Sequence, residues 1–433
     1  MDVSLILTHR CNLACGYCYA GEHHKSDIDD EVLRRAVELL YSDGASRAQL
    51  SFFGGEPFLA FDAMRRATAL AEERARREGG TLSLQCTTNG SVLKPEHVRF
   101  VRDHGMHVTV SIDGIREAHE LNRPCGGGKP SFDQVRGGLR ALIKAGVPCD
   151  AMMVITPETA QYAYLSANFL WSEGVTTVRA NLDLTAKWSD LERAELREQL
   201  ESIGWEMLAR RLRGEDTSFK PFERGMRQPD PSRPNQKRNK VVVATTGNLY
   251  PCAPMVGEDR NDGREAALRL GHIDDGAPTI QLSVASEGVA CESGRGCECA
   301  AYLETGDRTT LGRMGRWYGL VCQEMGASLR ESLAQHQDMP PPRRKRRGFL
   351  IGLAAVVGGA AVGGPLLAGL LADDPAPRPC QLRTRKQNAP VPEDLPVPGE
   401  MPMVLEPEPV IEPEPMVDGE MPVEMEMLGD VSY

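Results

Sequence analysis

Hydrophobic positions in the first 185 residues follow two alternating spacings. Short runs rich in β-branched and aromatic residues are followed by longer stretches in which apolar residues recur every three to four positions. This alternation is typical of βα units around a parallel sheet. The predicted strands cover residues 3–8, 49–53, 82–88, 107–111, 150–155 and 175–181. The predicted helices cover residues 30–41, 62–77, 132–145 and 158–172.

Six such units predict an α/β fold, a partial (βα)6 barrel that resembles an incomplete TIM barrel, over residues 1–186. A closed barrel of this kind needs eight units, so an open one is expected. Functional residues of such barrels lie at the C-terminal ends of the strands. We therefore expect the chemistry in the loops that follow the strands.

The rest of the chain changes composition several times. A polar bridge, helical as far as residue 213 and then loop-like, is expected over 187–240, followed by a small cysteine-rich domain over 241–326. That domain has little apolar material, so a metal is expected to stabilise it. A basic linker follows over 327–347, then an apolar segment over 348–372 and an acidic tail rich in Pro, Glu and Met over 373–433.

The acidic charge of the chain is concentrated in the tail. Of the formal net charge of -11, residues 373–433 hold 14 Asp and Glu against 4 Lys and Arg. The first 372 residues are nearly neutral, with 47 acidic and 46 basic side chains, and so carry no electrostatic signature of nucleic-acid binding. The tail is too polar to repay the entropy of ordering and is expected to be disordered.

The apolar segment over 348–372 is uncharged and long enough to cross a hydrocarbon core of about 30 Å. It follows a basic run, which indicates an inner-membrane anchor with the catalytic body in the cytoplasm and the tail outside. Because Arg346 and Arg347 precede it, the segment also resembles a twin-arginine export signal, and both interpretations stay open. The N-terminus shows no signal peptide, which favours a reducing environment for the body.

Three of the twelve cysteines lie within eight residues, on the loop after the first predicted strand. Thiolates of Cys11, Cys15 and Cys18 can ligate three irons of a cubane cluster, which leaves the fourth iron open to a bidentate small molecule. The alternative is a structural zinc site. Its fourth ligand would be one of the nearby histidines, His9, His23 or His24.

Three further motifs end the next predicted strands: Phe52 to Pro57 (FFGGEP), Thr87 to Gly90 (TTNG) and Ser111 to Gly114 (SIDG). Together with the C-x3-C-x2-C triplet, which has an aromatic residue before its last cysteine, they resemble the radical S-adenosylmethionine (radical SAM) superfamily. The resemblance covers residues 2–185.

This resemblance implies a four-iron four-sulfur cluster on Cys11, Cys15 and Cys18, whose open iron takes the amino and carboxylate groups of S-adenosylmethionine. It implies reductive cleavage to a 5′-deoxyadenosyl radical that abstracts hydrogen from a C–H bond, with no further catalytic side chain. The implied S-adenosylmethionine contacts are Tyr17 at the adenine, Gly54, Gly55, Glu56 and Pro57 at the amino group, Ser111 and Asp113 at the ribose and carboxylate, and Asn89 and Arg123 as further candidates. For Asn89 and Arg123 the alternatives are a turn cap and a surface arginine.

A second cysteine group follows Tyr250 and Pro251 and resembles the auxiliary cluster domain called SPASM, or its shorter twitch form. Its members are Cys252, Cys291, Cys297, Cys299 and Cys322. Five thiols suffice for one auxiliary four-iron four-sulfur cluster with one thiol spare. The usual C-x2-C pair is replaced here by C-x5-C-x-C, and a zinc-stabilised knuckle is the alternative.

The resemblance implies an enzyme that modifies a peptide or protein, of the type that matures ribosomally made peptides. A sulfatase-maturing enzyme that forms formylglycine is the alternative enzyme, and an electron-transfer protein is the non-catalytic alternative. A flavodoxin or ferredoxin is the expected reductant. The fused tail is either the substrate itself or a proline-rich spacer.

Overall fold

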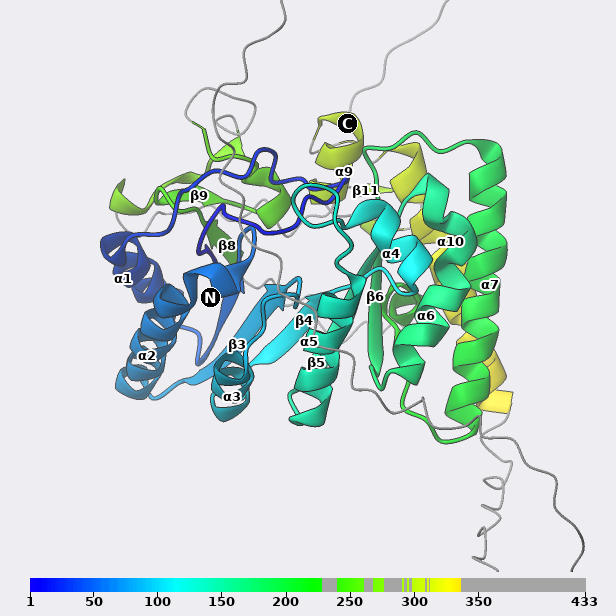
Figure 1. Cartoon of the computed structure of the whole chain (residues 1–433), viewed down its shortest axis with the longest axis horizontal. Coiled ribbons are helices and arrows are strands. Elements are labelled where there is room, and N and C mark those ends of the chain that lie inside the picture. The colour runs from blue at the N-terminus through cyan, green and yellow to red at the C-terminus, as the bar shows by residue number, and fades with distance from the viewer. Residues whose placement is uncertain are drawn as a thin grey trace, which may run out of the picture. The chain divides into compact units, whose positions relative to one another are not determined.

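The computed structural model describes residues 1–227, 240–260, 268–275, 290–291, 294–295, 298–307, 310 and 312–335. Their main feature is a ten-stranded sheet of order β10-β9-β8-β1-β2-β3-β4-β5-β6-β7 (Figure 1). The strands β1 to β6 are parallel neighbours in chain order, which confirms the predicted α/β arrangement. These six strands are Asp2–Ile6, Arg47–Phe53, Thr81–Thr88, His107–Ser111, Cys149–Ile155 and Thr177–Leu182.

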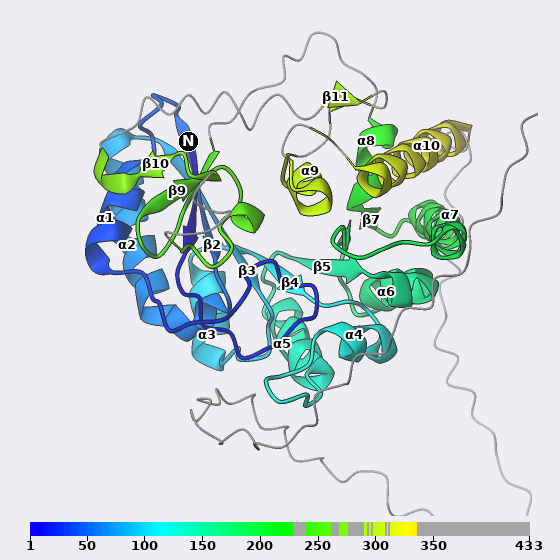
Figure 2. The same ribbon diagram turned by 90° about the horizontal axis from the view of Figure 1, so that it is seen from above.

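Helices follow β1 to β5 along one face of the sheet (Figure 2). They are α1 (Asp30–Glu38), α2 (Phe61–Glu78), α3 (Pro95–Asp103), α4 (Arg116–Asn122), α5 (Phe132–Lys144) and α6 (Ala163–Ser172). The helices α3 and α4 were not predicted, because each has fewer than ten residues and too few apolar positions to show a period. The helix predicted over 158–172 begins instead as a 3-10 turn, Pro157–Tyr162, because Pro157 follows a Thr156 cap.

Side chains alternate across the sheet, so its two faces differ. Leu50, Phe52, Val108 and Val110 are fully buried in the core beneath the helices. On the opposite face β2 carries polar side chains: there the Gln49 side-chain amide donates to the Ser51 hydroxyl at 3.1 Å. The core thus packs on the helix-covered face of the strands, and the polar side chains of β2 lie on the other face.

Both edges of the six-stranded unit are extended, so the barrel stays open. At one edge β8 (Lys240–Val243) pairs in parallel with β1, and β9 (Asn248–Tyr250) and β10 (Gly271–His272) follow in antiparallel order. The cysteine-rich unit predicted over 241–326 was expected to form its own small domain. Its first strands instead share the main sheet, because β8 pairs with the free edge of β1 and β9 pairs with β8.

At the other edge β7 (Ser218–Phe219) covers only the start of β6. Beyond it the Tyr318 hydroxyl of α10 (Arg313–Gln335) donates to the Ala180 carbonyl at 3.2 Å. The same helix packs beside α7 (Asp190–Leu212), which lies in the region predicted to be helical up to residue 213. Because α10 runs to Gln335, the boundary predicted between residues 326 and 327 falls inside a helix.

Short elements complete the described part: η1 (Pro57–Ala60), η3 (Lys220–Phe222), α8 (Glu223–Met226), η4 (Ala253–Met255), η6 (Ile273–Asp275), β11 (Ala290–Cys291), β12 (Gly294–Arg295) and α9 (Glu298–Thr305). None of the helices in the described ranges is long and apolar enough to cross a membrane. The apolar segment over 348–372 and the tail over 373–433 lie outside the described residues.

Candidate active site

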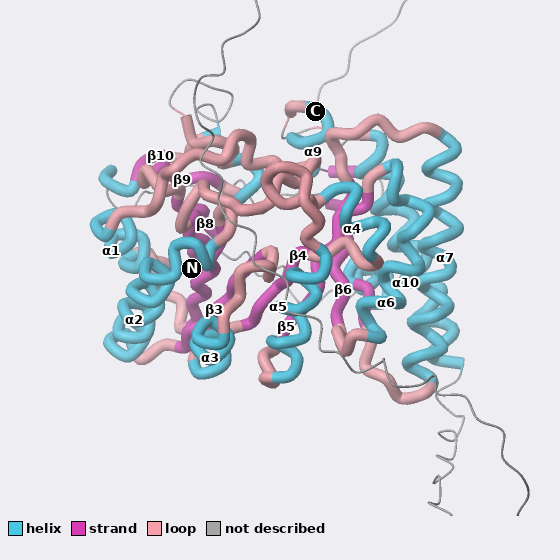
Figure 3. Tube along the Cα trace, viewed as in Figure 1, coloured by secondary structure: helices cyan, strands magenta, loops and turns pink. Residues whose placement is uncertain are grey.

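The loop between β1 and α1 carries the three clustered cysteines along the edge where the parallel strands end (Figure 3). It lies against the segment after α4, where the Ala14 amide donates to the Pro124 carbonyl at 2.8 Å and the Gly16 amide to the Asn122 carbonyl at 2.9 Å. The thiols of Cys11, Cys15 and Cys18 are free and half-buried. The loop is thus fixed by its backbone and keeps all three thiols available as ligands.

The Gly54-Gly55 turn at the end of β2 lies directly against the residues before Cys11. Gly54 has φ +142°, and a Cβ there would lie 2.4 Å from the Thr8 carbonyl oxygen. A Cβ on Gly55 would lie 2.3 Å from the Arg10 carbonyl oxygen, and the Gly55 amide donates to Thr8 at 2.8 Å. Glycine is required here because the turn and the cysteine loop touch backbone to backbone.

Glu56 joins the ends of β2 and β3 from a fully buried position. Its carboxylate accepts the Thr88 hydroxyl at 2.7 Å, the Asn89 amide at 2.7 Å and the Phe58 amide at 3.1 Å. Burial raises the pKa of Glu56 to about 7, although these three hydrogen bonds oppose the rise. A carboxylate offers about four acceptor positions, so capacity remains for one cation beside the three protein donors. Pro57 follows as the first residue of η1.

Asp113, after β4, is the centre of a buried charged group. Its carboxylate accepts the Tyr17 hydroxyl at 2.5 Å and the Val154 amide at 2.9 Å, and the Arg123 guanidinium lies 3.0 Å away. Arg123 also lies over the Tyr17 ring, 5.1 Å from its centroid. Burial raises the pKa of Cys15 to about 11, and the adjacent Arg123 opposes this rise. Arg123 is therefore no surface residue: only 5% of it is exposed.

Asn89 links the cysteine loop to the end of β3. Its side-chain amide donates to the Asn12 side-chain oxygen at 3.1 Å and lies 3.8 Å from the Cys11 sulfur. Asn12 in turn donates to the Ser91 hydroxyl at 2.8 Å. Asn89 thus organises the turn and also reaches a cysteine, so both predicted roles are compatible with its place. Ser111 is half-buried at the end of β4, two residues from Asp113.

The structure brings together residues that sequence reasoning did not single out. Thr88 holds Glu56, Asn12 and Ser91 hold Asn89, and the Arg10 side chain donates to the Leu59 carbonyl at 2.8 Å. Their signal in the sequence is weak, because they are small polar residues inside or beside motifs already assigned. Only the folded structure shows that each of these residues is hydrogen-bonded to a residue of the site or of its turns.

The chemistry of the three thiols fits a multinuclear cluster. Burial raises the pKa of Cys11 and of Cys18, so the thiols hold their protons until a metal displaces them. Among the described residues, no group of three His, Cys, Asp or Glu side chains, the three thiols included, is arranged to hold a metal ion. His23 approaches Cys18 at 3.7 Å, while His9 and His24 stack on each other. One of the three histidines of the zinc alternative, His23, thus lies beside a thiol of the group.

The second cysteine group is only partly assembled by the described residues. Cys252 and Cys299 are joined as a disulfide with a Cα–Cα distance of 6.5 Å, in a small apolar cluster apart from the main core. Cys322 is buried within the main core on α10, and its thiol interacts with Tyr318. Cys291 lies in β11, with its side chain outside the described set, and Cys297 lies outside the described residues.

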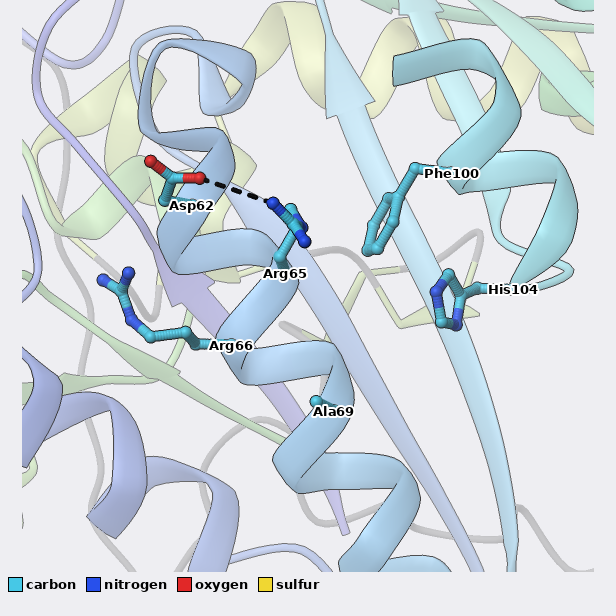
Figure 4. A pocket seen from close by; sticks show the side chains of 6 residues that line it. All are labelled: Asp62, Arg65, Arg66, Ala69, Phe100 and His104. Carbon is cyan, nitrogen blue, oxygen red and sulfur yellow. Dashed lines mark ion pairs between the residues drawn. The ribbon is translucent and has the colours of Figure 1, made fainter. Parts of the chain in front are cut away.

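A separate hollow of about 550 Å³ lies on the outside of the molecule between α2 and α3 (Figure 4). It is lined by Asp62, Arg65, Arg66, Ala69, Phe100 and His104. None of these is a predicted site residue. The chemistry is expected at the strand ends, where the cysteines, Glu56 and Asp113 lie.

Residues 5–170 match the Radical SAM superfamily. Curated relatives include a serine-type anaerobic sulfatase-maturating enzyme of Bacteroides thetaiotaomicron, 34% identical over 168 residues, which cover 37% of this chain and 40% of the relative. A cysteine-type enzyme of the same name from Clostridium perfringens is 28% identical over 163 residues, which cover 35% of this chain and 43% of the relative. The chain thus spans about two fifths of the length of these relatives.

Solved structures extend the likeness beyond the matched domain. A structure described as native anSMEcpe with bound AdoMet has a TM-score of 0.65 and 19% identity, and the match covers 77% of this chain and 99% of that one. A second structure of that protein, with bound AdoMet and a Cp18Cys peptide, has a TM-score of 0.64 at 19% identity and covers 78% of this chain and 100% of that one. At this identity the likeness shows a shared fold.

Proposed function

Because residues 5–170 form a radical SAM domain, we propose that this chain is a radical SAM enzyme that modifies a side chain in a peptide or protein. The observation that carries the proposal is the group of three free thiols beside the Gly54-Gly55-Glu56 turn. An electron carrier needs the thiols but has no need of a turn that holds an amino acid.

The radical SAM domain uses a four-iron four-sulfur cluster and S-adenosylmethionine, which when bound supply reductive cleavage to a 5′-deoxyadenosyl radical. We assign Cys11, Cys15 and Cys18 as the cluster ligands. Glu56 holds the strand ends and offers its remaining acceptor position to the methionine amino group. Arg123 provides positive charge beside Cys15, and Asp113 fixes both Arg123 and Tyr17. The buried position of this group limits access of water.

The two relatives named sulfatase-maturating enzymes, and the peptide in the second solved structure, support a peptide or protein substrate. Maturation of a ribosomally made peptide is the leading proposal for the substrate, and the chain's own tail remains the candidate peptide. The names of the relatives favour formylglycine formation as the second candidate. A flavodoxin or ferredoxin would supply the electron.

For the second cysteine group we propose one auxiliary four-iron four-sulfur cluster. The nearness of Cys252 to Cys299 supports it, because two sulfurs that can form a disulfide can, once reduced, flank one cluster. Cys322 is the thiol we leave out, since it belongs to a different apolar cluster.

The test is an anaerobic reconstitution of the full chain with iron and sulfide, followed by reduction and an assay for 5′-deoxyadenosine. We expect nucleoside formation from the cluster-loaded protein. Absence of the nucleoside from reduced, loaded protein would eliminate both enzyme functions and leave electron transfer. Intact mass analysis of the tail, with and without the three cysteines, then separates a tail substrate from a spacer.

A further inference from the structure

A latch joins the cysteine loop to a distant part of the chain. It consists of Gly21, Glu22 and His24 on the loop and of Glu258 after η4. The Glu22 amide donates to the Glu258 carboxylate at 2.9 Å, and His24 Nε2 lies 3.1 Å from the Glu258 carbonyl oxygen. Gly21 has φ +69°, and a Cβ there would lie 2.5 Å from the Glu258 carboxylate. A side chain at residue 21 would therefore displace the Glu258 carboxylate, and the backbone there adopts a conformation that favours glycine.

Glu258 is held on a rigid support. Its neighbour Asp259 is buried and has φ +54°, a conformation that the sheet maintains. The Asp259 carboxylate accepts the Tyr250 hydroxyl at 2.7 Å and the Asn248 side-chain amide at 2.9 Å, both from β9. Because β9 belongs to the main sheet through β8, the latch connects the cysteine loop to the core.

The latch acts on both ends of the cysteine loop. His24, after Cys18, stacks on the buried His9, before Cys11, with ring centroids 4.3 Å apart. His23, between the latch residues, lies 3.7 Å from the Cys18 sulfur. Contacts that fix His24 therefore restrict the chain on either side of the three thiols.

We propose that Glu258 is a positioning residue for the cluster site, which holds Cys18 in place through Glu22 and His24. A residue 236 positions further along the chain than Glu22 would then complete the site formed by the first domain. The effect of Glu258 on a cluster rests on the proposed function. The contact of Glu258 with Glu22 and His24 does not, because it is present in the protein without a cluster.

The first test uses the full chain, reduced and free of iron, and follows alkylation of individual thiols by mass spectrometry. In Glu258→Ala we expect Cys18 to react about fivefold faster relative to Cys149, because one lost hydrogen bond shifts a local opening equilibrium by about that factor. Cys149 is a suitable reference because it is free and half-buried on β5. An unchanged ratio would overturn the proposal.

Two further variants separate the latch from general loosening. Glu258→Gln keeps an oxygen that accepts from the Glu22 amide, so it should restore the Cys18 rate of the unchanged chain. Arg260→Ala removes ion pairs to Glu258 and Glu22 but leaves both latch hydrogen bonds, and exposed pairs of this kind contribute little, so the rate should stay within about twofold. Equal acceleration in Arg260→Ala and Glu258→Ala would contradict the assigned role.

The second test uses the full chain loaded with iron and sulfide and records the electron paramagnetic resonance spectrum of the reduced cluster. In Glu258→Ala the spectral change caused by S-adenosylmethionine should require about fivefold more of it at equal iron content, for the same energetic reason. Identical titrations in both chains would overturn the proposal. If the unchanged chain shows no spectral response, the proposed function fails, and the alkylation ratio still decides the latch.

Discussion

The two cysteine groups of this chain differ in the number of structural elements that carry their thiols. The first lies within eight residues, on one loop whose start lies against one glycine turn. The second is spread from Cys252 to Cys322, and the four members that the structure describes lie at the start of η4 and in β11, α9 and α10. Ligands that come from one loop form a motif that can be recognised in the sequence. Ligands that come from several elements are brought together only by the packing of those elements.

Removing the two groups one at a time tests this difference, and it has the largest expected effect on iron content and on activity. Replacing Cys11, Cys15 and Cys18 by Ala should abolish cleavage of S-adenosylmethionine and leave about half of the iron. Replacing Cys252 and Cys299 by Ala should keep cleavage but stop modification of a peptide. Iron analysis and a 5′-deoxyadenosine assay measure both effects. Complete loss of iron in the first variant would mean that the second group holds no cluster.

A glycine substitution tests how strictly the first site depends on close backbone contact. In Gly55→Ala the new Cβ would meet the Arg10 carbonyl oxygen, so the residues before Cys11 must move. A displacement of about 1 Å lowers catalysis by roughly 100-fold, and we expect a decrease of that order in nucleoside formation.

Gly126→Ala is the matched control on the segment that faces the same loop. Its Cβ would lie 3.9 Å from the nearest atom, the Asn12 carbonyl oxygen, which is ordinary contact distance. This variant should keep activity within about twofold, because the added methyl fits the open space. Similar losses of nucleoside formation in both variants would contradict the assigned role of the close contact at Gly55, because the loop would then be equally sensitive to a change without a clash.

The pH dependence of stability tests the buried Glu56. Its pKa is raised to about 7 in the folded chain, so between about pH 4.5 and pH 7 the folded state binds more protons than the unfolded state. Stability of the cluster-free chain should therefore fall across this range as the pH rises, by about 3 kcal/mol from this group. Denaturant unfolding at several pH values measures the slope.

In Glu56→Gln this contribution to the slope should vanish, whatever the absolute stability of the variant. An unchanged slope would show that Glu56 stays ionised in the folded chain through its three hydrogen bonds. The comparison isolates one group, because both chains share every other titrating side chain.

The sequence was sufficient to predict the parallel strands and the sheet edge at which the motif residues lie, for a physical reason. Strands such as His107–Ser111 are marked by apolar residues on alternate positions, and motifs at their ends lie together because parallel strands end at one edge. The shared sheet of β8 and β1 and the long helix α10 were missed, because they depend on pairing and packing between residues far apart in the chain. The buried state of Arg123 was missed for the same reason: its partner Asp113 is identified only by the fold.

The smallest effect is expected at Cys322, which lies in a different apolar cluster from Cys252 and Cys299. Its side chain is buried beside Tyr318 in the main core, so Cys322→Ala should lower the free energy of unfolding by about 1 kcal/mol through lost packing. Iron content should stay the same, since a residue in a separate apolar cluster is not needed as a ligand. Denaturant unfolding and iron analysis on the full chain measure the two quantities. Loss of the auxiliary iron in Cys322→Ala, with the first site intact, would place this thiol back among the ligands and require α10 to approach Cys252.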